Sequence, residues 1–246
     1  MLCGATFKDE VRRRDELVMR AGAGRVLLHP SAVILHPFDN GEPRMVQLIP
    51  PPDTIMQILT RTGAFREGHF IYPNGKHTPH YFQMPLAFRY YDTARVLAVA
   101  LSRKFRLERD IASQLPKVSV ISPSSGGIPV AFGVRDALSA EQIYWAEQEG
   151  GERMFRQYVN QGEINPCIIV DDIIRSGNAI EETVRLVRSL GAPIIGCGAI
   201  VRFTGAPKDI DGVPIKSLIE FDAKFYDTGA QCTECKSGAP EETVRF

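Results

Sequence analysis

The fold is decided by the stretch Ile168-Ile169-Val170-Asp171-Asp172-Ile173-Ile174-Arg175-Ser176-Gly177-Asn178-Ala179. An apolar run over residues 167–170 predicts a strand that is buried on both faces. Two adjacent carboxylates follow the run, then a short polar turn, and then the start of a helix. Because ligands of parallel α/β sheets bind beyond the carboxyl ends of the strands, this junction is the first candidate for a binding site.

The residues of this junction suit a phosphate group. Backbone N–H groups at the start of a helix point outward and attract an anion. Ser176 adds a hydroxyl, Arg175 a positive charge, and Gly177 allows the backbone to come close to a ligand. Asp171 and Asp172 would then bind hydroxyls or a metal-bound ligand. The alternative is that both acids only cap the helix, with Ser176 as a second cap, but several independent features agree on the binding interpretation.

The sequence around this stretch alternates between apolar runs and helical patterns, which predicts a parallel α/β sheet flanked by helices. The runs that predict strands are residues 118–121, 143–146, 167–170, 193–201 and 217–221. Two earlier helices are expected, one capped by Asp53 and ended by Gly63, the other capped by Asp92. The aromatic, Pro-rich and Gly-rich residues 69–91 predict a hairpin and loops between them.

Composition excludes several classes of protein. The chain has 246 residues and a formal net charge of zero, so no global electrostatic attraction to nucleic acid is expected. No apolar run is long enough to span a membrane, and the charged N-terminus does not predict a secretory signal. Of the five cysteines, Cys167 and Cys197 lie in apolar runs. We therefore expect reduced thiols and a cytoplasmic protein.

Residues 1–50 differ in character from residues 53–246, which we expect to form the functional domain. They contain scattered prolines and end in Pro50-Pro51-Pro52, which disfavours regular structure. The favoured interpretation is a loosely held N-terminal extension, or a start codon assigned too early. A small appended β element is the alternative.

Four motifs in order give the chain a resemblance to the type I phosphoribosyltransferases, and most of all to the bacterial orotate phosphoribosyltransferases. Residues 168–179 resemble the strand, the acid pair and the phosphate loop of that family. Residues 68–83 are similar to its N-terminal substrate region, residues 122–128 to its pyrophosphate-side loop, and residues 146–156 to its mobile catalytic loop. The resemblance implies the family's fold, with a parallel sheet and a small N-terminal hood.

The same resemblance implies the reaction. A nitrogenous base, with orotate favoured, displaces pyrophosphate from C1 of 5-phosphoribosyl-1-pyrophosphate (PRPP), with Mg2+ held mainly by the pyrophosphate and no direct protein ligand to the metal. The transition state would have oxocarbenium character, as in glycoside chemistry. A homodimer is also implied, because the mobile loop of such proteins typically reaches into a partner subunit.

Site roles carried over from the family fall into two groups. Catalysis is expected from Asp171, Asp172 and Arg153. Substrate binding is expected from Arg175, Ser176, Gly177, Asn178 and Ala179 at the 5-phosphate, from Ser124, Ser125, Gly126 and Gly127 at the pyrophosphate, and from Lys76, Tyr81, Phe82, Glu149, Arg156 and Arg202 elsewhere in the site.

Some positions depart from the family pattern. The phosphate loop usually reads Thr-Thr-Gly-Gly followed by Thr or Ser, whereas residues 175–179 read Arg-Ser-Gly-Asn-Ala. The mobile loop has Gln148 where a cation is usual, and the arginine that helps to bind orotate is either displaced to Arg202 or absent. These differences leave two alternatives open: transfer to another base, or a regulatory protein that binds PRPP without catalysis.

Two further patterns contain residue types that bind metals. The pair Cys232-x-x-Cys235 is half of a zinc site, but the nearby sequence has no His or Cys that supplies the other half. His69, His77 and His80 lie close together in the substrate-like region, where ordinary polar roles are expected. Neither pattern alone predicts a metal centre.

Overall fold

The computed structural model describes residues 48–123, 125–157 and 159–244. The extension expected over residues 1–50 therefore lies almost entirely outside the described residues. The elements, in chain order, are α2 (Pro52–Thr62), β1 (Phe65–Ile71), β2 (His77–Phe82), α3 (Pro85–Phe88), α4 (Tyr91–Arg106), α5 (Arg109–Ala112), β3 (Ser119–Ser122), α6 (Ile128–Leu138), β4 (Gln142–Glu149), β5 (Glu152–Phe155), β6 (Cys167–Ile174), α7 (Asn178–Ser189), β7 (Ile194–Phe203), β8 (Asp209–Ile210), β9 (Val213–Phe221), α8 (Thr233–Ser237) and β10 (Glu241–Thr243).

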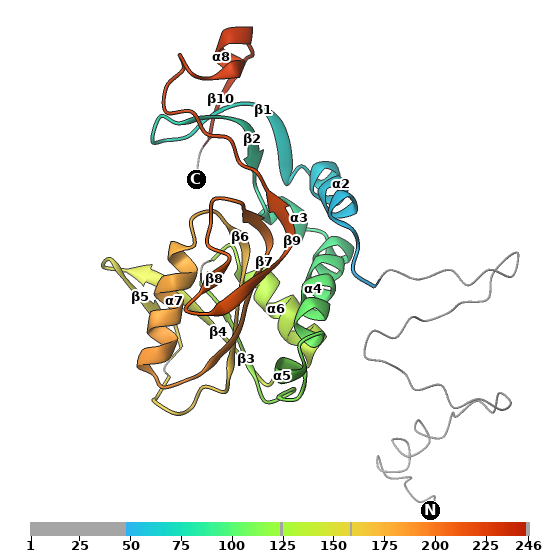
Figure 1. The fold of residues 1–246 in the computed structure, drawn as a ribbon, viewed down its shortest axis with the longest axis vertical. Coiled ribbons are helices and arrows are strands. Elements are labelled where there is room, and N and C mark those ends of the chain that lie inside the picture. Colours follow the sequence, from blue (N-terminus) through green and yellow to red (C-terminus); the bar gives the residue numbers. More distant parts are fainter. Residues whose placement is uncertain (1–47, 124, 158, 245–246) are drawn as a thin grey trace, which may run out of the picture. The chain divides into compact units, whose positions relative to one another are not determined.

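The main sheet has seven strands in the order β5-β4-β3-β6-β7-β9-β8. Its five central strands pair in parallel, while β5 and β8 are antiparallel edge strands. Helix α7 covers one face, and helices α4 and α6 cover the other (Figure 1). The expected parallel sheet flanked by helices is confirmed.

Each face of the sheet has its own apolar core. Val120, Ile168 and Val170 pack with α2, α4 and α6, whereas Ile169 and Cys197 pack with α7. All five of these side chains are fully buried. Because successive residues of a strand point to opposite faces, a strand covered on both sides needs apolar residues at every position. This is why the unbroken runs in the sequence located the five central strands, although β4, β6 and β9 extend beyond the expected bounds.

Two expected helix caps are each wrong by two residues. Helix α2 begins at Pro52 with Pro51 as its N-cap, and α4 begins at Tyr91 with Tyr90 as its N-cap. In each case the aspartate lies within the first turn, where its charge favours the positive end of the helix dipole. Gly63 ends α2 in the left-handed conformation, with φ of 76°, as expected.

The hood is a separate three-stranded sheet in the order β10-β1-β2. Strands β1 and β2 form an antiparallel hairpin, and β10, near the end of the chain, pairs in parallel with β1. Phe70, Tyr81 and Val244 form its small apolar cluster. The hood therefore joins residues from the start and the end of the described chain.

Candidate active site

Strand β6 carries the acid pair inside the sheet rather than after it. The strand was expected to end at residue 170, but it continues to Ile174, and Asp171 lies beside Ala199 of β7. Asp171 and Asp172 are 5% and 7% exposed. The backbone N–H of Asp172 donates to Asp171 Oδ1 at 3.0 Å, and that of Ile173 to Asp172 Oδ1 at 2.8 Å.

Capping of α7 does not explain the acid pair. The N-cap of α7 is Gly177, with no side-chain hydrogen bond to the helix end. Ser176 Oγ accepts from the N–H of Asn178 at 3.5 Å, the outer limit for a hydrogen bond. The first turn of α7 therefore keeps N–H groups that a ligand could use.

Burial raises the pKa of Asp172, although hydrogen bonds from Asp171 and Ile173 and the charge of Arg175 oppose that rise. A buried carboxylate is costly unless hydrogen-bond donors or a positive charge approach it. The acid pair is therefore suited to hydroxyl donors or to a centre that becomes positive during a reaction.

The glycine pair after β3 packs directly on these acids. A Cβ on Gly126 would lie 2.9 Å from Asp172 Oδ2, and a Cβ on Gly127 would overlap Asp171 Oδ1 and lie 2.7 Å from Ser122 Oγ. No larger residue fits at either position without displacing an acid. The pyrophosphate-side loop and the acid pair are thus in direct contact.

A cavity of about 420 Å³ opens where these segments meet. It is lined by Ser125, Gly126, Asp171, Asp172, Ile173, Ile174, Arg175, Ser176, Gly177, Ala179 and Ile180. Eight of the residues predicted from sequence are in this lining, while Gly127 lies behind Asp171 and Asn178 begins α7. Ser124 is outside the described residues.

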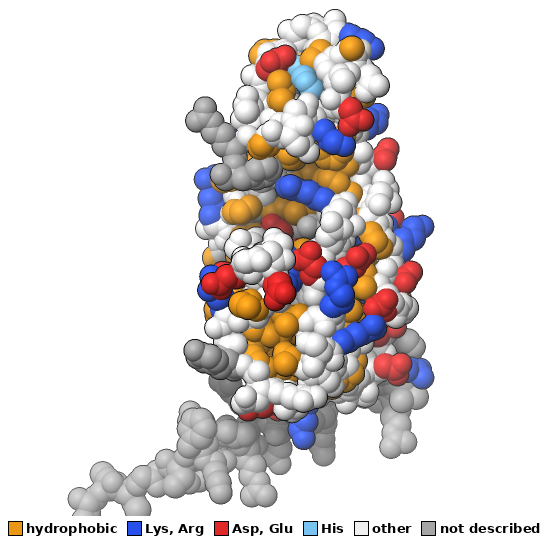
Figure 2. All heavy atoms as spheres, turned by 90° about the vertical axis from the view of Figure 1, so that its left-hand side faces the viewer, with side chains coloured by type: hydrophobic (Ala, Val, Ile, Leu, Met, Phe, Trp, Pro, Cys, Tyr) orange, Lys and Arg blue, Asp and Glu red, His pale blue; other side chains and the backbone are white. Residues whose placement is uncertain are grey.

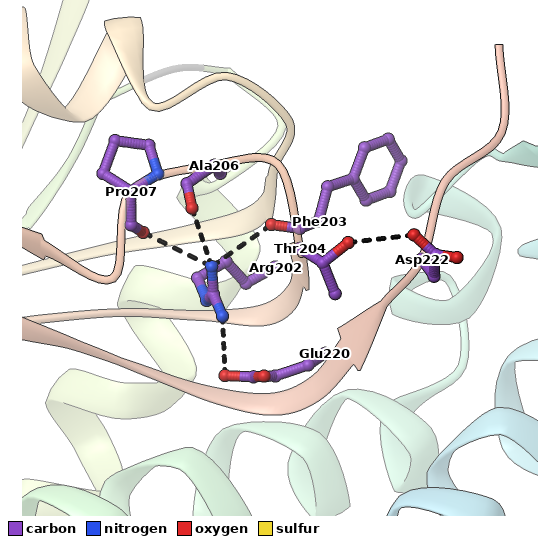
Figure 3. Close-up of polar contacts among 7 residues, drawn as sticks. All are labelled: Arg202, Phe203, Thr204, Ala206, Pro207, Glu220 and Asp222. Atoms are coloured by element: carbon purple, nitrogen blue, oxygen red, sulfur yellow. Dashed lines mark hydrogen bonds and ion pairs between the residues drawn. The ribbon is translucent and has the colours of Figure 1, made fainter.

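Arg202 lies behind the phosphate loop rather than in the cavity lining. Its side chain is 1% exposed and forms an ion pair with Glu220 at 2.7 Å. Its other terminal nitrogen donates to the carbonyl oxygens of Phe203, Ala206 and Pro207 at 3.3, 2.8 and 3.5 Å (Figure 3). Arg202 therefore holds the turn that follows β7.

The turn after β7 also contacts the loop between β6 and α7. Gly177 has φ of 92°, and a Cβ there would lie 2.9 Å from Cδ of Pro207. Nearby, Thr204 donates to Asp222 at 3.1 Å, so the turn is also fastened to the chain after β9 (Figure 3). Arg202 connects to the phosphate loop through Pro207, a role that the sequence pattern did not suggest.

The segment that resembles a mobile loop is the hairpin of β4 and β5. Gly150 and Gly151, with φ of 61° and 88°, make its two-residue turn. Arg153 is mostly buried, donates to Glu182 of α7 at 3.0 Å and also donates to the carbonyl of Pro123. The hairpin is thereby joined to the pyrophosphate-side loop.

Arg156 and Glu149 lie on the exposed part of this hairpin. Arg156 pairs with Glu147 at 2.7 Å and with Glu149 at 3.4 Å. Figure 2 shows that a hollow opens on the side of the molecule that carries the hairpin, with charged side chains of both signs beside it. Neither residue lines the cavity in the described structure.

The expected hood residues do not line the cavity either. Lys76 is exposed and pairs with Asp227 at 3.0 Å, and Phe82 packs in the main core. Tyr81 is buried, with its ring 5.5 Å from that of Phe70.

Tyr72, which follows β1, is a further residue of the hood whose surroundings the sequence did not predict. Burial raises the pKa of its phenol, and the positive charge of Arg175 opposes that rise. The aromatic content of residues 69–91 predicts a hairpin and loops but does not distinguish this position.

The structure also corrects the interpretation of the Cys and His residues. The half-site at Cys232 and Cys235 was expected to lack partners, yet its sulfurs lie beside the rings of His69 and His77. His80 is apart from them, packed edge-on against Phe221 at 4.8 Å. The partners are missing from the nearby sequence because they come from the other end of the domain.

Comparisons with known proteins identify relatives of the chain. No family model matches the chain. The chain is 32% identical over 190 residues to a protein of Thermotoga petrophila named orotate phosphoribosyltransferase, which covers 76% of this chain and 95% of the relative. A Thermus thermophilus protein of the same name is 30% identical over 192 residues, covering 77% of this chain and 99% of the relative.

Solved structures show the same fold. The orotate phosphoribosyltransferase of Aeropyrum pernix superposes with a TM-score of 0.54 at 21% identity, covering 67% of this chain and 92% of that one. The Mycobacterium tuberculosis H37Rv enzyme, solved with inorganic phosphate, gives 0.52 at 18% identity, covering 69% and 95%. With the sequence relatives above, these findings show that this chain belongs to the orotate phosphoribosyltransferase family.

Proposed function

We propose that this chain transfers the phosphoribosyl group of PRPP to orotate, giving orotidine 5′-phosphate and pyrophosphate. One observation carries the proposal: two buried carboxylates and an uncapped helix N-terminus line the same cavity. An anion-binding helix end next to an acid pair suits a ribose 5-phosphate, because the helix N–H groups can bind the phosphate while the carboxylates accept hydrogen bonds from the ribose hydroxyls.

In the proposed mechanism the C1–O bond of PRPP breaks and its electron pair leaves with pyrophosphate. The ring nitrogen of orotate bonds to C1 from the opposite face, and its N–H proton is released. Asp171 and Asp172 would hold the ribose hydroxyls and favour the positive charge that develops on the sugar. Residues 175–179 would hold the 5-phosphate through backbone N–H groups, Ser176 and the charge of Arg175.

The pyrophosphate end would be held by residues 124–127. Gly126 and Gly127 leave the backbone close to the acid pair, which brings its N–H groups to the reacting end of the sugar. Arg153 would stabilise the departing charge from the hairpin, and its bond to the carbonyl of Pro123 already connects it to this loop. Arg156 and Glu149 would close over the ligand, and Lys76, Tyr81 and Phe82 would shape the hood above it.

Magnesium would bind at this site together with the pyrophosphate of the substrate. The cavity has carboxylate oxygens from Asp171 and Asp172, which can accept hydrogen bonds from the water ligands that Mg2+ usually keeps. When bound, the ion would neutralise charge on the pyrophosphate and so make it a better leaving group. Because Mg2+ usually keeps several waters and binds through phosphates, most of its ligands would come from the substrate.

For Arg202 we propose a positioning role instead of contact with the base. Its guanidinium is bound to carbonyl oxygens of the turn that packs on Gly177, and its side chain is 1% exposed. It would keep the phosphate loop in place from behind.

The cellular setting and assembly are part of the same proposal. Residues 53–246 would be the catalytic domain, working in the cytoplasm as a homodimer. The free buried thiols of Cys167 and Cys197 suit a reducing compartment. Among the described residues, no helix is both long and apolar enough to cross a membrane. Light scattering after size-exclusion chromatography tests the dimer.

A second candidate function is transfer to a different base. It is favoured by the sequence Arg-Ser-Gly-Asn-Ala at the phosphate loop and by the use of Arg202 inside the protein. Absorbance of orotate, followed with PRPP and Mg2+, separates the candidates. We expect the absorbance to fall with orotate. Turnover only with another base would move the proposal to that base, and PRPP binding without turnover of any base would favour a regulator.

A further inference from the structure

Four metal-ligand side chains from three segments of the hood converge on one point. His69 lies on β1, His77 begins β2, and Cys232 and Cys235 lie at α8. One ligand atom from each of them lies within 4.8 Å of all the others. His69 and Cys232 are buried and the other two are half-buried. We call this group the His–Cys cluster.

The strand register explains how the two histidines meet. Ile71 of β1 lies opposite His77 of β2. His69 precedes this pair, in the part of β1 where the register with β2 shifts between Glu67 and Phe70. There its Nε2 comes to 2.9 Å from His77 Nδ1. The apolar cluster of Phe70, Tyr81 and Val244 is a separate group of hood side chains.

The distances are close to those of a tetrahedral site. Zinc bonds of about 2.0–2.1 Å to nitrogen and 2.3 Å to sulfur place ligand atoms about 3.3–3.8 Å apart. His69 Nε2 lies 2.9 Å from His77 Nδ1, 3.4 Å from Cys235 Sγ and 3.7 Å from Cys232 Sγ. Cys235 Sγ lies 3.4 Å from His77 Nδ1. These four separations are within about half an ångström of the tetrahedral values, and the most distant ligand atoms, up to 4.8 Å apart, would have to approach by about 1 Å.

The surroundings of the cluster orient its ligands. Nδ1 of His69 lies 3.1 Å from the carbonyl oxygen of Ala239. A proton on Nδ1 donates to that carbonyl and leaves the lone pair of Nε2 directed at the cluster, as in metal-bound histidines. Gly238 makes this possible, because its φ of 71° turns the chain after α8 and presents the next carbonyl.

A glycine also makes room for the second sulfur. A Cβ on Gly229 would lie 3.2 Å from Cys235 Sγ and 3.7 Å from Cε1 of His77. The chain before α8 therefore passes close over the cluster without a side chain between them.

We propose that the His–Cys cluster binds one zinc ion that holds the hood together. Two thiolates and two imidazoles in a tetrahedron are the donor set that favours zinc among common metals. All four ligands come from the protein, which is the arrangement of a structural site. Binding releases the two thiol protons, one of which Cys232 now donates to Glu234 at 3.4 Å. The proton that His77 Nδ1 shares with His69 Nε2 moves to Nε2 of His77, which remains a neutral imidazole with Nδ1 free to bind the metal.

The hood needs such a link because its own core is small. Phe70, Tyr81 and Val244 are the buried members of its apolar cluster, and a sheet of this size gains little from burial alone. The zinc would fasten the segment around α8 to both strands of the β1–β2 hairpin.

Metal analysis of the full chain tests the proposal. The protein is purified without chelators, incubated with zinc, freed of excess metal and measured by plasma mass spectrometry. We expect about one zinc per chain, and about one-tenth or less in the double variant Cys232→Ser, Cys235→Ser. Cys197→Ala and His80→Gln are matched controls, since each removes the same type of residue outside the cluster, and both should keep the metal.

Absorption spectroscopy of the wild-type protein with Co2+ gives a second test, which uses no variant and so does not depend on whether the variants fold. Wild-type protein loaded with Co2+ should show the visible absorption of tetrahedral cobalt and a thiolate-to-cobalt band in the near ultraviolet. Absence of stoichiometric zinc in the wild type, retention of zinc by the double variant, or an octahedral cobalt spectrum without a thiolate band would each overturn the proposal.

Discussion

The cavity at β6 and the His–Cys cluster of the hood are assembled from the chain in opposite ways. Most residues of the cavity lie within residues 171–180, joined by Ser125 and Gly126 from the loop after the neighbouring strand β3. The cluster joins His69 to Cys232, which is 163 residues further along the chain. A contiguous site is visible as a motif, whereas a site built by strand pairing becomes visible only when the pairing is known.

The two regions also differ in what supports them. The cavity rests on a sheet with apolar cores on both faces, while the hood has one small cluster. We therefore expect changes at the cavity to affect activity more than folding, and changes in the hood to do the reverse. The predictions below test that contrast, from the largest expected effect to the smallest.

Asp172→Asn should lower the rate of transfer about 100-fold or more, equivalent to about 3 kcal/mol of transition-state stabilisation. The amide keeps the size of the side chain but loses the charge that favours a positive sugar. Orotate absorbance gives the rate and circular dichroism the fold. Asp136→Asn, an exposed site on α6, is the control. Unchanged activity in Asp172→Asn would show that the site is misplaced.

The same variant should not be less stable than the wild type at neutral pH. Since burial raises the pKa of Asp172, its contribution to stability is present below the unfolded-state pKa and is lost as pH rises through the folded-state value. Asn does not ionise and therefore loses no stability in this way. Between the unfolded-state and the folded-state pKa of Asp172, the free energy of unfolding of the variant minus that of the wild type should increase with pH. Urea unfolding at several pH values measures it, and a relative stability that decreases with pH would contradict the stated cause.

Arg202→Met should destabilise the protein by about 2–3 kcal/mol, because three carbonyl oxygens of the turn after β7 lose their donor. If the arginine positions the phosphate loop, the KM for PRPP should rise more than kcat falls. Arg202→Lys keeps a donor and should recover part of both. An increase in the KM for orotate alone would instead favour direct contact with the base.

Gly127→Ala should lower both stability, by about 2 kcal/mol, and activity, because its Cβ overlaps Asp171. Gly205→Ala is a matched control, since a Cβ there meets nothing within 4 Å. Thermal unfolding and the orotate assay measure the pair. Equal behaviour of the two variants would contradict the close packing of the glycine pair on the acids.

His80 should make the hood sensitive to mild acid. Burial lowers the pKa of its imidazole to about 4 from 6.5, so the unfolded chain takes up the proton first as pH falls. Stability is complete above pH 6.5 and decreases as the pH falls toward 4, by on the order of 1–2 kcal/mol. His80→Phe should flatten this dependence in hydrogen exchange of β2. The same slope in both proteins would assign the effect to other groups.

The sequence predicted the sheet and the turn between β6 and α7 because both are encoded locally. Apolar runs predicted the central strands, and the acid pair with its Ser-Gly turn predicted the cavity. The end of β6 was misjudged because Asp171 and Asp172 are polar, yet their backbone still pairs with β7. Local polarity does not reveal a strand that continues through buried acids.

Contacts between segments that are far apart in the chain could not be predicted from the sequence pattern. Nothing near Arg202 in the sequence shows that its guanidinium binds the turn that supports Gly177, because that depends on how the chain returns after β7. The partners of Cys232 and Cys235 likewise depend on β1 and β2 lying beside α8. Both cases require the three-dimensional pairing of distant segments.

The most direct test of the central claim is calorimetric titration of PRPP with Mg2+ into the wild type and into a variant of the phosphate loop. Ser176→Ala, Gly177→Ala removes a hydroxyl and crowds the loop against Pro207. We expect saturable binding to the wild type and at least about tenfold weaker binding to the variant. Equal affinity of the two proteins, or no binding to the wild type, would contradict a sugar phosphate site between β6 and α7.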